Sequence, residues 1–277
     1  MRLSAHDIDD LIDVVRNAAA SEIMPRFRNL SVSDVETKSG PADLVTVADR
    51  AAEEMIRRGV EKILPGAAVI GEEAVAEDAR LLDAICTCET CVIVDPIDGT
   101  GNYVAGLAVF GTILAVVHNG QTMFGILYDP VLDDWMFAQR GDGAWFRRPD
   151  GTVTRLGSCD KSSALNQARG YVTLDDYDSS TREIVRRGFD PVMNIRDIRC
   201  SCHEYRGLVS GRVDFLRSYA LKPWDHAAGV LLVEEVGGWA AVDGEHPYSP
   251  SLRHGRLVAA TSEPLGRRIA ELAAPLP

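Results

Sequence analysis

Two acidic residues follow an apolar run in the first half of the chain. Residues 92–94 are valine, isoleucine and valine; Asp95 and Asp98 come after them, and then Gly-Thr-Gly at residues 99–101. Two carboxylates at the end of a buried strand crowd like charges, which raises the pKa of at least one unless a cation neutralises them. The pattern therefore predicts a site for a hard divalent metal, and the alternative is a turn whose aspartates cap a helix.

The residues between and after these acids suit an anionic ligand beside the metal. Pro96 rigidifies the turn, and the glycines at positions 99 and 101 let another group approach the backbone closely. If a helix starts here, the free amides of residues 99–102 form a nest for an anion. This combination favours a metal and a phosphate bound side by side.

Two further segments supply acids that could complete such a site. Glu72 and Glu73 follow a short expected strand, and because neighbouring side chains point in different directions, only one of them is expected to bind a metal. Asp225 stands at the start of an alanine-rich helix that Trp224 would anchor. The alternatives are a solvated pair of acids and a plain helix N-cap.

Every candidate ligand in these segments is an oxygen, which favours magnesium or manganese over zinc. Cys86, Cys88 and Cys91 could bind a soft metal. A zinc site needs a fourth ligand, however, and Cys91 opens an apolar run typical of a buried strand, so free thiols are the favoured interpretation. His203 and His226 are interpreted as hydrogen-bonded structural residues rather than as an acid and a base.

Hydrophobic periodicity and turn residues place these segments on a mixture of helices and strands. Helices are expected over residues 6–30, 46–63, 180–187, 202–210, 226–236 and 264–272. Strands are expected over residues 68–71, 91–94, 110–117, 122–128, 134–138, 170–173, 213–217, 239–242 and 257–261. The strands of the first half are predicted to form an antiparallel meander, and the two halves, 1–150 and 151–277, to pack together as sheet-and-helix layers.

Local signals set some of these boundaries. Thr46 is expected to cap the second helix with Asp49 three residues on, the spacing of a capping box. Two glycines at positions 237 and 238 are expected to stop the helix that begins at residue 226. The Lys-Ser-Gly-Pro sequence at residues 38–41 predicts a hinge.

The overall charge restricts the class of partner. The 277 residues include 29 basic and 41 acidic side chains, a formal net charge of −12, which disfavours nucleic acid and anionic membranes. A phosphorylated small molecule must then be attracted locally, by a metal or by backbone amides. The acidic start of the chain is unlike a secretory signal, and no run reaches the ~18 apolar residues of a membrane span, so we expect a cytoplasmic protein.

Four motifs, taken in order, resemble those of the inositol monophosphatase family within the lithium-sensitive, magnesium-dependent phosphatases. They are Asp-Leu-Val-Thr-Val-Ala-Asp at residues 43–49, Gly-Glu-Glu at 71–73, Asp-Pro-Ile-Asp-Gly-Thr at 95–100 and Trp-Asp at 224–225. The resemblance spans nearly the whole chain. It implies an α+β fold, a layered α-β-α-β-α sandwich with the site between the halves, and a homodimer.

The resemblance also implies a role for each matching residue in hydrolysing a small-molecule phosphate ester with two or three Mg²⁺ ions and no covalent phosphoenzyme. The implied metal ligands are Glu72, Asp95, Asp98, Asp225 and the carbonyl of Ile97, with Asp95 bridging. The residues that would orient the attacking water are Glu72, Thr100 and Asp49. The backbone amides of Gly99, Thr100 and Gly101 would hold the phosphate, and Lys38 matches a loop that closes over the metals.

Two departures from the family pattern concern the substrate. Inositol-specific relatives have a glutamate where this chain has Ser218, and a common Gly-Ser/Thr-Ala pattern is Arg-Cys-Ser here, ending at Ser201. A pocket around Ser201, Arg217 and Ser218 could suit histidinol phosphate, fructose 1,6-bisphosphate, another sugar phosphate or a nucleotide phosphate instead of an inositol phosphate. A regulatory protein-interaction role is the alternative class, for which a cluster of arginines at 182, 186 and 187 is the only basic feature.

Overall fold

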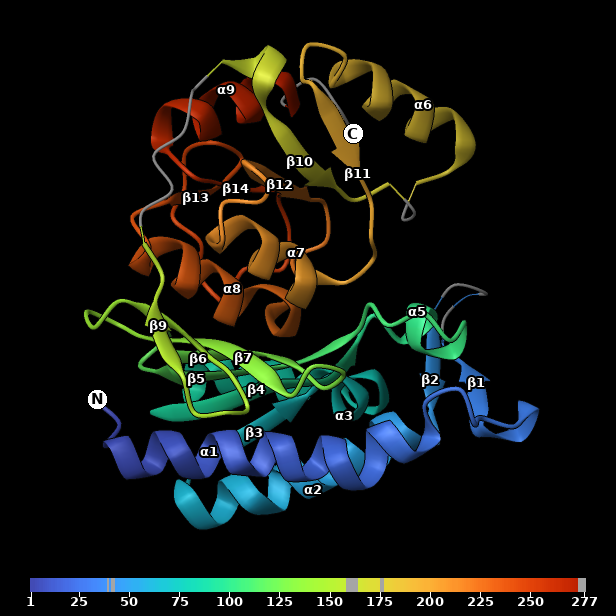
Figure 1. Ribbon diagram of the computed structural model, residues 1–277, viewed down its shortest axis with the longest axis vertical. Coiled ribbons are helices and arrows are strands. Elements are labelled where there is room, and N and C mark those ends of the chain that lie inside the picture. Colours follow the sequence, from blue (N-terminus) through green and yellow to red (C-terminus); the bar gives the residue numbers. More distant parts are fainter. Residues whose placement is uncertain (39, 41–42, 158–163, 175–176, 274–277) are drawn as a thin grey trace.

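The computed structural model describes residues 1–38, 40, 43–157, 164–174 and 177–273, and within them two main sheets alternate with pairs of helices (Figure 1). Helices α1 (Ala5–Ala18) and α2 (Val47–Ile63) cover the outer face of the larger sheet. Helices α7 (Ser201–Val209) and α8 (Pro223–Glu235) lie between the sheets. Helices α6 (Ser179–Gly188) and α9 (Glu263–Ala273) cover the smaller sheet. The predicted α-β-α-β-α sandwich is confirmed.

The larger sheet contains seven strands in the described part of the chain, in sequence order from one edge to the other. They are β3 (Ala68–Gly71), β4 (Thr90–Asp98), β5 (Gly111–His118), β6 (Gln121–Asp129), β7 (Asp134–Gln139), β8 (Ala144–Arg147) and β9 (Val153–Arg155). Strands β4 to β9 form the predicted antiparallel meander, whereas β3 pairs parallel to β4. Strands β8 and β9 were not predicted, because three or four residues are too few to show an alternating pattern.

A break in the pairing of β4 with β5 determines where the acids of β4 point. Asp95 pairs with Ile113 and Asp98 pairs with Gly111, so three steps along β4 correspond to two along β5. Residues three apart on a regular strand face opposite sides of a sheet, and the extra residue of this bulge brings them to the same side. Pro96 lies within the break, where its missing amide costs no ladder hydrogen bond.

The smaller sheet has five strands in the described residues, in the order β11-β10-β12-β14-β13. Their bounds are β10 (Arg169–Val172), β11 (Asn194–Arg196), β12 (Phe215–Ser218), β13 (Trp239–Val242) and β14 (Leu257–Ala260). The three-residue edge strand β11 was not predicted. The division of the chain at residue 150 stays a prediction: the larger sheet continues to β9, and the smaller one starts at Arg169.

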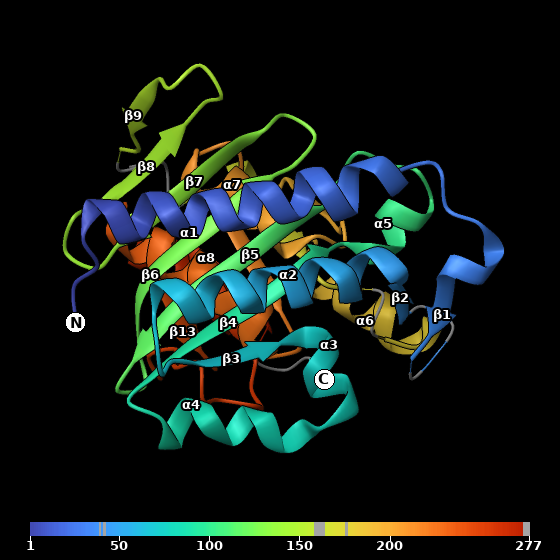
Figure 2. The ribbon, with the colours of Figure 1, turned by 90° about the horizontal axis from the view of Figure 1, so that it is seen from below.

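The outer helices α1 and α2 lie side by side across the larger sheet (Figure 2). Thr46 and Asp49 form the predicted capping box at the start of α2. The first helix was predicted to reach residue 30, but after α1 the chain continues as a π-helical turn, Ala19–Ile23, and a 3-10 turn, Met24–Arg26. Pro25 explains the early end, since it has no amide to donate to the preceding turn.

Helix α8 starts three residues earlier than predicted, because Pro223 suits the first helical position. Asp225 therefore lies in the first turn of the helix, and the cap position is occupied by Lys222. The helix ends at Glu235, and Gly237 follows with φ at +79°, as the glycine stop predicts.

Shorter elements complete the path between these layers. Two strands that were not predicted, β1 (Val35–Thr37) and β2 (Leu44–Thr46), pair as an antiparallel hairpin whose loop carries the expected hinge. Ser39 and Pro41 of that hinge lie outside the described residues. The short helices are α3 (Glu72–Glu77), α4 (Ala84–Thr87) and α5 (Thr100–Val104). None of the described helices is long and apolar enough to cross a membrane.

Candidate active site

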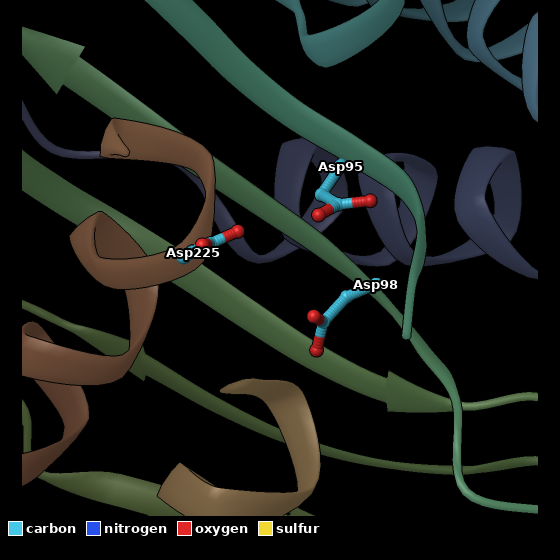
Figure 3. Close-up of side chains that lie close together, drawn as sticks. All are labelled: Asp95, Asp98 and Asp225. Carbon is cyan, nitrogen blue, oxygen red and sulfur yellow. The ribbon is translucent and has the colours of Figure 1, made fainter. Parts of the chain in front are cut away.

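Three aspartates from two distant segments meet at the junction of the sheets. Asp95 and Asp98 come from the bulged end of β4, and Asp225 comes from the first turn of α8. One carboxylate oxygen from each lies within 4.8 Å of the other two, and the side chains point toward one another (Figure 3). Among the described residues, no other three acidic, histidine or cysteine side chains converge in this way.

The environment of Asp95 fits a bound cation. The side chain is buried, and its Oδ1 has no hydrogen-bond partner among the described residues. Burial raises the pKa of Asp95 well above its usual value, and the charges of Glu72, Asp98 and Asp225 raise it further. A buried oxygen without a partner is costly unless a ligand satisfies it, and oxygen-only donor sets suit Mg²⁺.

Asp98 is fixed by the start of α7, which belongs to the second half of the chain. Its Oδ2 accepts a hydrogen bond from the amide of Cys202 and another, at 3.2 Å, from the thiol of Cys200. Burial raises the pKa of Asp98 to about 6, and these donors partly oppose the shift. The contact aligns a metal-ligand candidate of the larger sheet with the helix layer between the sheets.

Glu72 opens α3 and lines the same cavity as the three aspartates, and its charge helps to raise the pKa of Asp95. A cation bound here would relieve this repulsion between like charges. Lys38 also reaches this point: its Nζ lies 3.0 Å from Glu72 Oε1 and 3.0 Å from Glu73 Oε1. Burial disfavours the charged lysine, but the two glutamates raise the pKa of Lys38 above its usual value.

Thr100 and Asp49 form the pair that the resemblance implies for orienting water. The Thr100 hydroxyl lies 3.2 Å from Asp49 Oδ1 and 2.9 Å from the carbonyl oxygen of Ile97. Asp49 is buried behind Thr100, and its other oxygen accepts hydrogen bonds from the amide and hydroxyl of Thr46. Burial raises the pKa of Asp49 to about 6. The capping box of α2 thus holds the acid that Thr100 contacts.

A cavity of about 470 Å³ connects these groups. Of the site residues named from the sequence, all but Lys38, Asp49 and Arg217 line it: Glu72, Asp95, Ile97, Asp98, Gly99, Thr100, Gly101, Ser201, Ser218 and Asp225. Gly99 has φ at +87°, which a residue with a Cβ adopts only at a cost, and α5 begins at the next residue. The first amides of a helix have no partner within it, so they can face a ligand.

Arg217, expected at the substrate pocket, is buried elsewhere. It is 1% exposed, and its Nη1 donates a hydrogen bond to the Tyr177 hydroxyl at 2.7 Å. Ser218, the next residue of β12, lines the cavity instead, because successive side chains of a strand point to opposite faces. The expectation that Arg217 contributes to the pocket is therefore wrong.

His226 is a buried, hydrogen-bonded residue, and the three clustered cysteines are free thiols. His226 is buried, its Nε2 lies 2.7 Å from the carbonyl oxygen of Ala220, and burial lowers its pKa to about 4, so its role is structural. Cys86, Cys88 and Cys91 are free and do not converge as a metal group within the described residues. Burial in β4 raises the pKa of Cys91 to about 12, so the free thiol stays protonated near neutral pH.

Glu53 is a positioning residue that the sequence did not reveal. From the buried face of α2, its carboxylate accepts hydrogen bonds from the amides of Glu73, at 2.8 Å, and Ala74, at 2.9 Å. Glu53 therefore caps the start of α3. Burial raises the pKa of Glu53 to about 7. The available signal was an acid between the buried residues Ala52 and Ile56.

Replacing Glu53 by alanine is expected to lower the free energy of unfolding by roughly 1–3 kcal/mol, because two amides lose their acceptor. The displaced α3 should also carry Glu72 out of position and weaken magnesium binding. Chemical denaturation and calorimetric magnesium titration measure the two effects. Glu54→Ala, a change at the exposed neighbour on the same helix, is the control; equal losses in both variants would contradict the capping role.

The chain resembles known proteins in both sequence and fold. The profile of the inositol monophosphatase family matches residues 6–275. A Thermotoga maritima protein named fructose-1,6-bisphosphatase/inositol-1-monophosphatase is 33% identical over 207 residues, 75% of this chain and 74% of its own. Escherichia coli Nus factor SuhB is 30% identical over 76% of this chain and 77% of its own. The solved Thermotoga maritima IMPase matches with a TM-score of 0.80 and 26% identity over 96% of each chain.

The family profile covers nearly the whole chain, and relatives named as phosphatases support the same class of activity. The layered fold is shared with the solved Thermotoga maritima structure. The chain therefore belongs to the inositol monophosphatase family.

Proposed function

We propose that the protein hydrolyses a small phosphate monoester by means of a magnesium-activated water, without a covalent phosphoenzyme. The observation that carries the proposal is the convergence of Asp95, Asp98 and Asp225 in one cavity with Thr100, whose hydroxyl contacts Asp49. The repulsion among so many neighbouring carboxylates is relieved better by two or three bound metal ions than by a single proton. The family relation supports the same activity.

We propose separate sets of residues for metal binding, for orienting the water and for holding the phosphate. Glu72, Asp95, Asp98, Asp225 and the carbonyl of Ile97 would hold the metal ions. Bound magnesium lowers the pKa of a coordinated water and neutralises charge on the phosphoryl and leaving oxygens. Thr100, held by Asp49, would orient the water together with Glu72. The amides of Gly99, Thr100 and Gly101 would hold the phosphate in line for attack.

The substrate proposal rests on two serines of the cavity lining. Ser201 and Ser218 line the cavity, and Ser218 replaces the acidic residue that contacts hydroxyls in inositol-specific relatives. We propose a small ester within the class of inositol-like polyol phosphates, histidinol phosphate and sugar phosphates. The name of the Thermotoga maritima relative, which includes fructose 1,6-bisphosphate as a substrate, supports testing sugar bisphosphates as well.

A substrate panel tests this proposal. Phosphate release is measured with Mg²⁺ from inositol 1-phosphate, histidinol phosphate, fructose 1,6-bisphosphate and 3′-phosphoadenosine 5′-phosphate. Turnover of one ester well above the others would establish the activity and identify the substrate. Absence of turnover from all four would contradict the proposed substrate class and favour a regulatory role, for which the name of the Escherichia coli relative is the supporting observation.

We further propose that the protein is a cytoplasmic homodimer. Within each chain, we propose that the two halves divide near residue 150. The resemblance to the family implies a dimer, and the five cysteines that the structure describes are free, as expected of a reducing compartment. Light scattering coupled to size-exclusion chromatography measures the assembly directly. A mass of one chain at working concentrations would contradict the dimer.

A further inference from the structure

Arg199 has an unusual backbone conformation at the edge of the active-site cavity. Its φ is +53°, in the left-handed region that favours glycine. The amide of Arg199 donates to Asp197 Oδ1 at 3.0 Å, which helps to hold the turn. Residues kept in a strained conformation concentrate at functional sites, where the surrounding structure maintains them.

The side chain of Arg199 extends over the turn proposed to hold the phosphate. A Cβ placed on Gly101 would lie 3.4 Å from Arg199 Nη2 and 3.6 Å from its Cζ. The guanidinium is therefore in contact range of the Gly101 backbone, and Arg199 and Gly101 both line the cavity. A phosphate held by the amides of residues 99–101 would lie beside this cation.

The charge of the cavity makes such a cation important. Among the described residues that line it, the basic side chains are Arg199 and Lys222, and the acidic ones are Asp43, Glu72, Asp95, Asp98, Asp197, Glu204 and Asp225. Lys222 is engaged on the metal side, where the charge of Asp225 raises its pKa above the usual value. Arg199 is thus the cationic side chain at the turn itself, in a chain whose net charge repels phosphate.

We propose that Arg199 is a phosphate-binding residue, whose guanidinium donates hydrogen bonds to non-bridging oxygens of the ester phosphate held over residues 99–101. Arginine suits this role because its planar donors match two phosphate oxygens at once. Arg199 can have this role only if the chain hydrolyses phosphate esters as proposed above. The strained backbone is then the cost of placing a long cationic side chain over this turn.

Binding of inorganic phosphate, followed by calorimetry in the presence of Mg²⁺, tests the assignment without turnover. Arg199→Gly should weaken phosphate binding by roughly 10-fold or more, the usual loss for a charged hydrogen bond. The same change should raise Tm by about 2–4 °C, because glycine relieves the left-handed strain. Arg199→Lys keeps the charge but loses the paired planar donors of the guanidinium. Its affinity for phosphate should therefore lie between those of the wild-type protein and Arg199→Gly.

Arg28 provides a matched control, because it is also a left-handed arginine, with φ at +59°, and does not line the cavity. Arg28→Gly should leave phosphate affinity unchanged. Unchanged affinity in Arg199→Gly, with wild-type protein binding phosphate normally, would overturn the role of Arg199 and leave the proposed function intact. If the wild-type protein bound no phosphate in Mg²⁺, both the proposed function and the role of Arg199 would be overturned.

Discussion

Asp95→Asn is expected to reduce kcat/KM by roughly 10³-fold or more while making the metal-free protein more stable. Asp95 faces a common space with Asp98 and Asp225, so its loss should weaken metal binding and remove several kcal/mol of the charge stabilisation that bound metal would supply to the transition state. In the metal-free protein the same change removes a carboxyl group whose ionisation is opposed by burial and by the charges of Glu72, Asp98 and Asp225. We expect a rise in Tm of about 2–4 °C, the shift that ~1 kcal/mol produces in a chain of this size.

Phosphate release in saturating Mg²⁺ and thermal unfolding in chelator measure the two effects of Asp95→Asn separately. Opposite signs are the informative feature, because a variant that merely misfolds loses both activity and stability. A lower Tm in chelator, or activity within 10-fold of wild type, would contradict a metal-binding role for Asp95. Wild-type protein in chelator is the reference for both measurements.

Thr100→Val and Asp49→Asn are each expected to lower kcat by roughly 10²- to 10³-fold, the contribution typical of a group that positions or moves a proton. The two side chains act as one unit through the contact between Thr100 Oγ1 and Asp49 Oδ1. The double variant should therefore be about as impaired as either single variant, since effects within a unit are not additive. Magnesium affinity should change much less than kcat.

Single-turnover kinetics on the four proteins of this cycle measures the coupling. Thr122→Val is the matched control, because Thr122 is a buried threonine of β6 that does not line the cavity. The control should lose stability without a comparable loss of kcat. Fully additive losses in the double variant would show that Thr100 and Asp49 act independently, against the proposed orientation of water.

The sequence predicted those parts of the site in which neighbouring residues determine the geometry. Thr46 and Asp49 fit a capping box, and that box places Asp49 where Thr100 can reach it. The apolar run before Asp95 predicted a buried strand, and crowding of like charges then predicted a cation. These inferences need only spacing and residue type, and the structure brings all of these residues together.

Other parts depend on contacts between distant segments. Spacing alone would put Asp95 and Asp98 on opposite faces of β4, and only the bulge against β5 brings them to one face. Glu53 caps α3 from another helix, twenty residues away in the chain. Arg217 was predicted to line the pocket, but its side chain points into the core, because neighbouring residues of a strand face opposite sides of the sheet. Such features are set by register and packing, which local sequence does not fix.

The most direct test of the central claim is the magnesium dependence of phosphate release by wild-type protein and by Asp98→Asn, measured on the preferred ester of the panel. We predict no release in chelator, full recovery on adding Mg²⁺, and a loss of several orders of magnitude in Asp98→Asn at every Mg²⁺ concentration. Phosphate release that persists in chelator, or near-normal activity in Asp98→Asn, would contradict the assignment of this carboxylate cluster as the catalytic metal site.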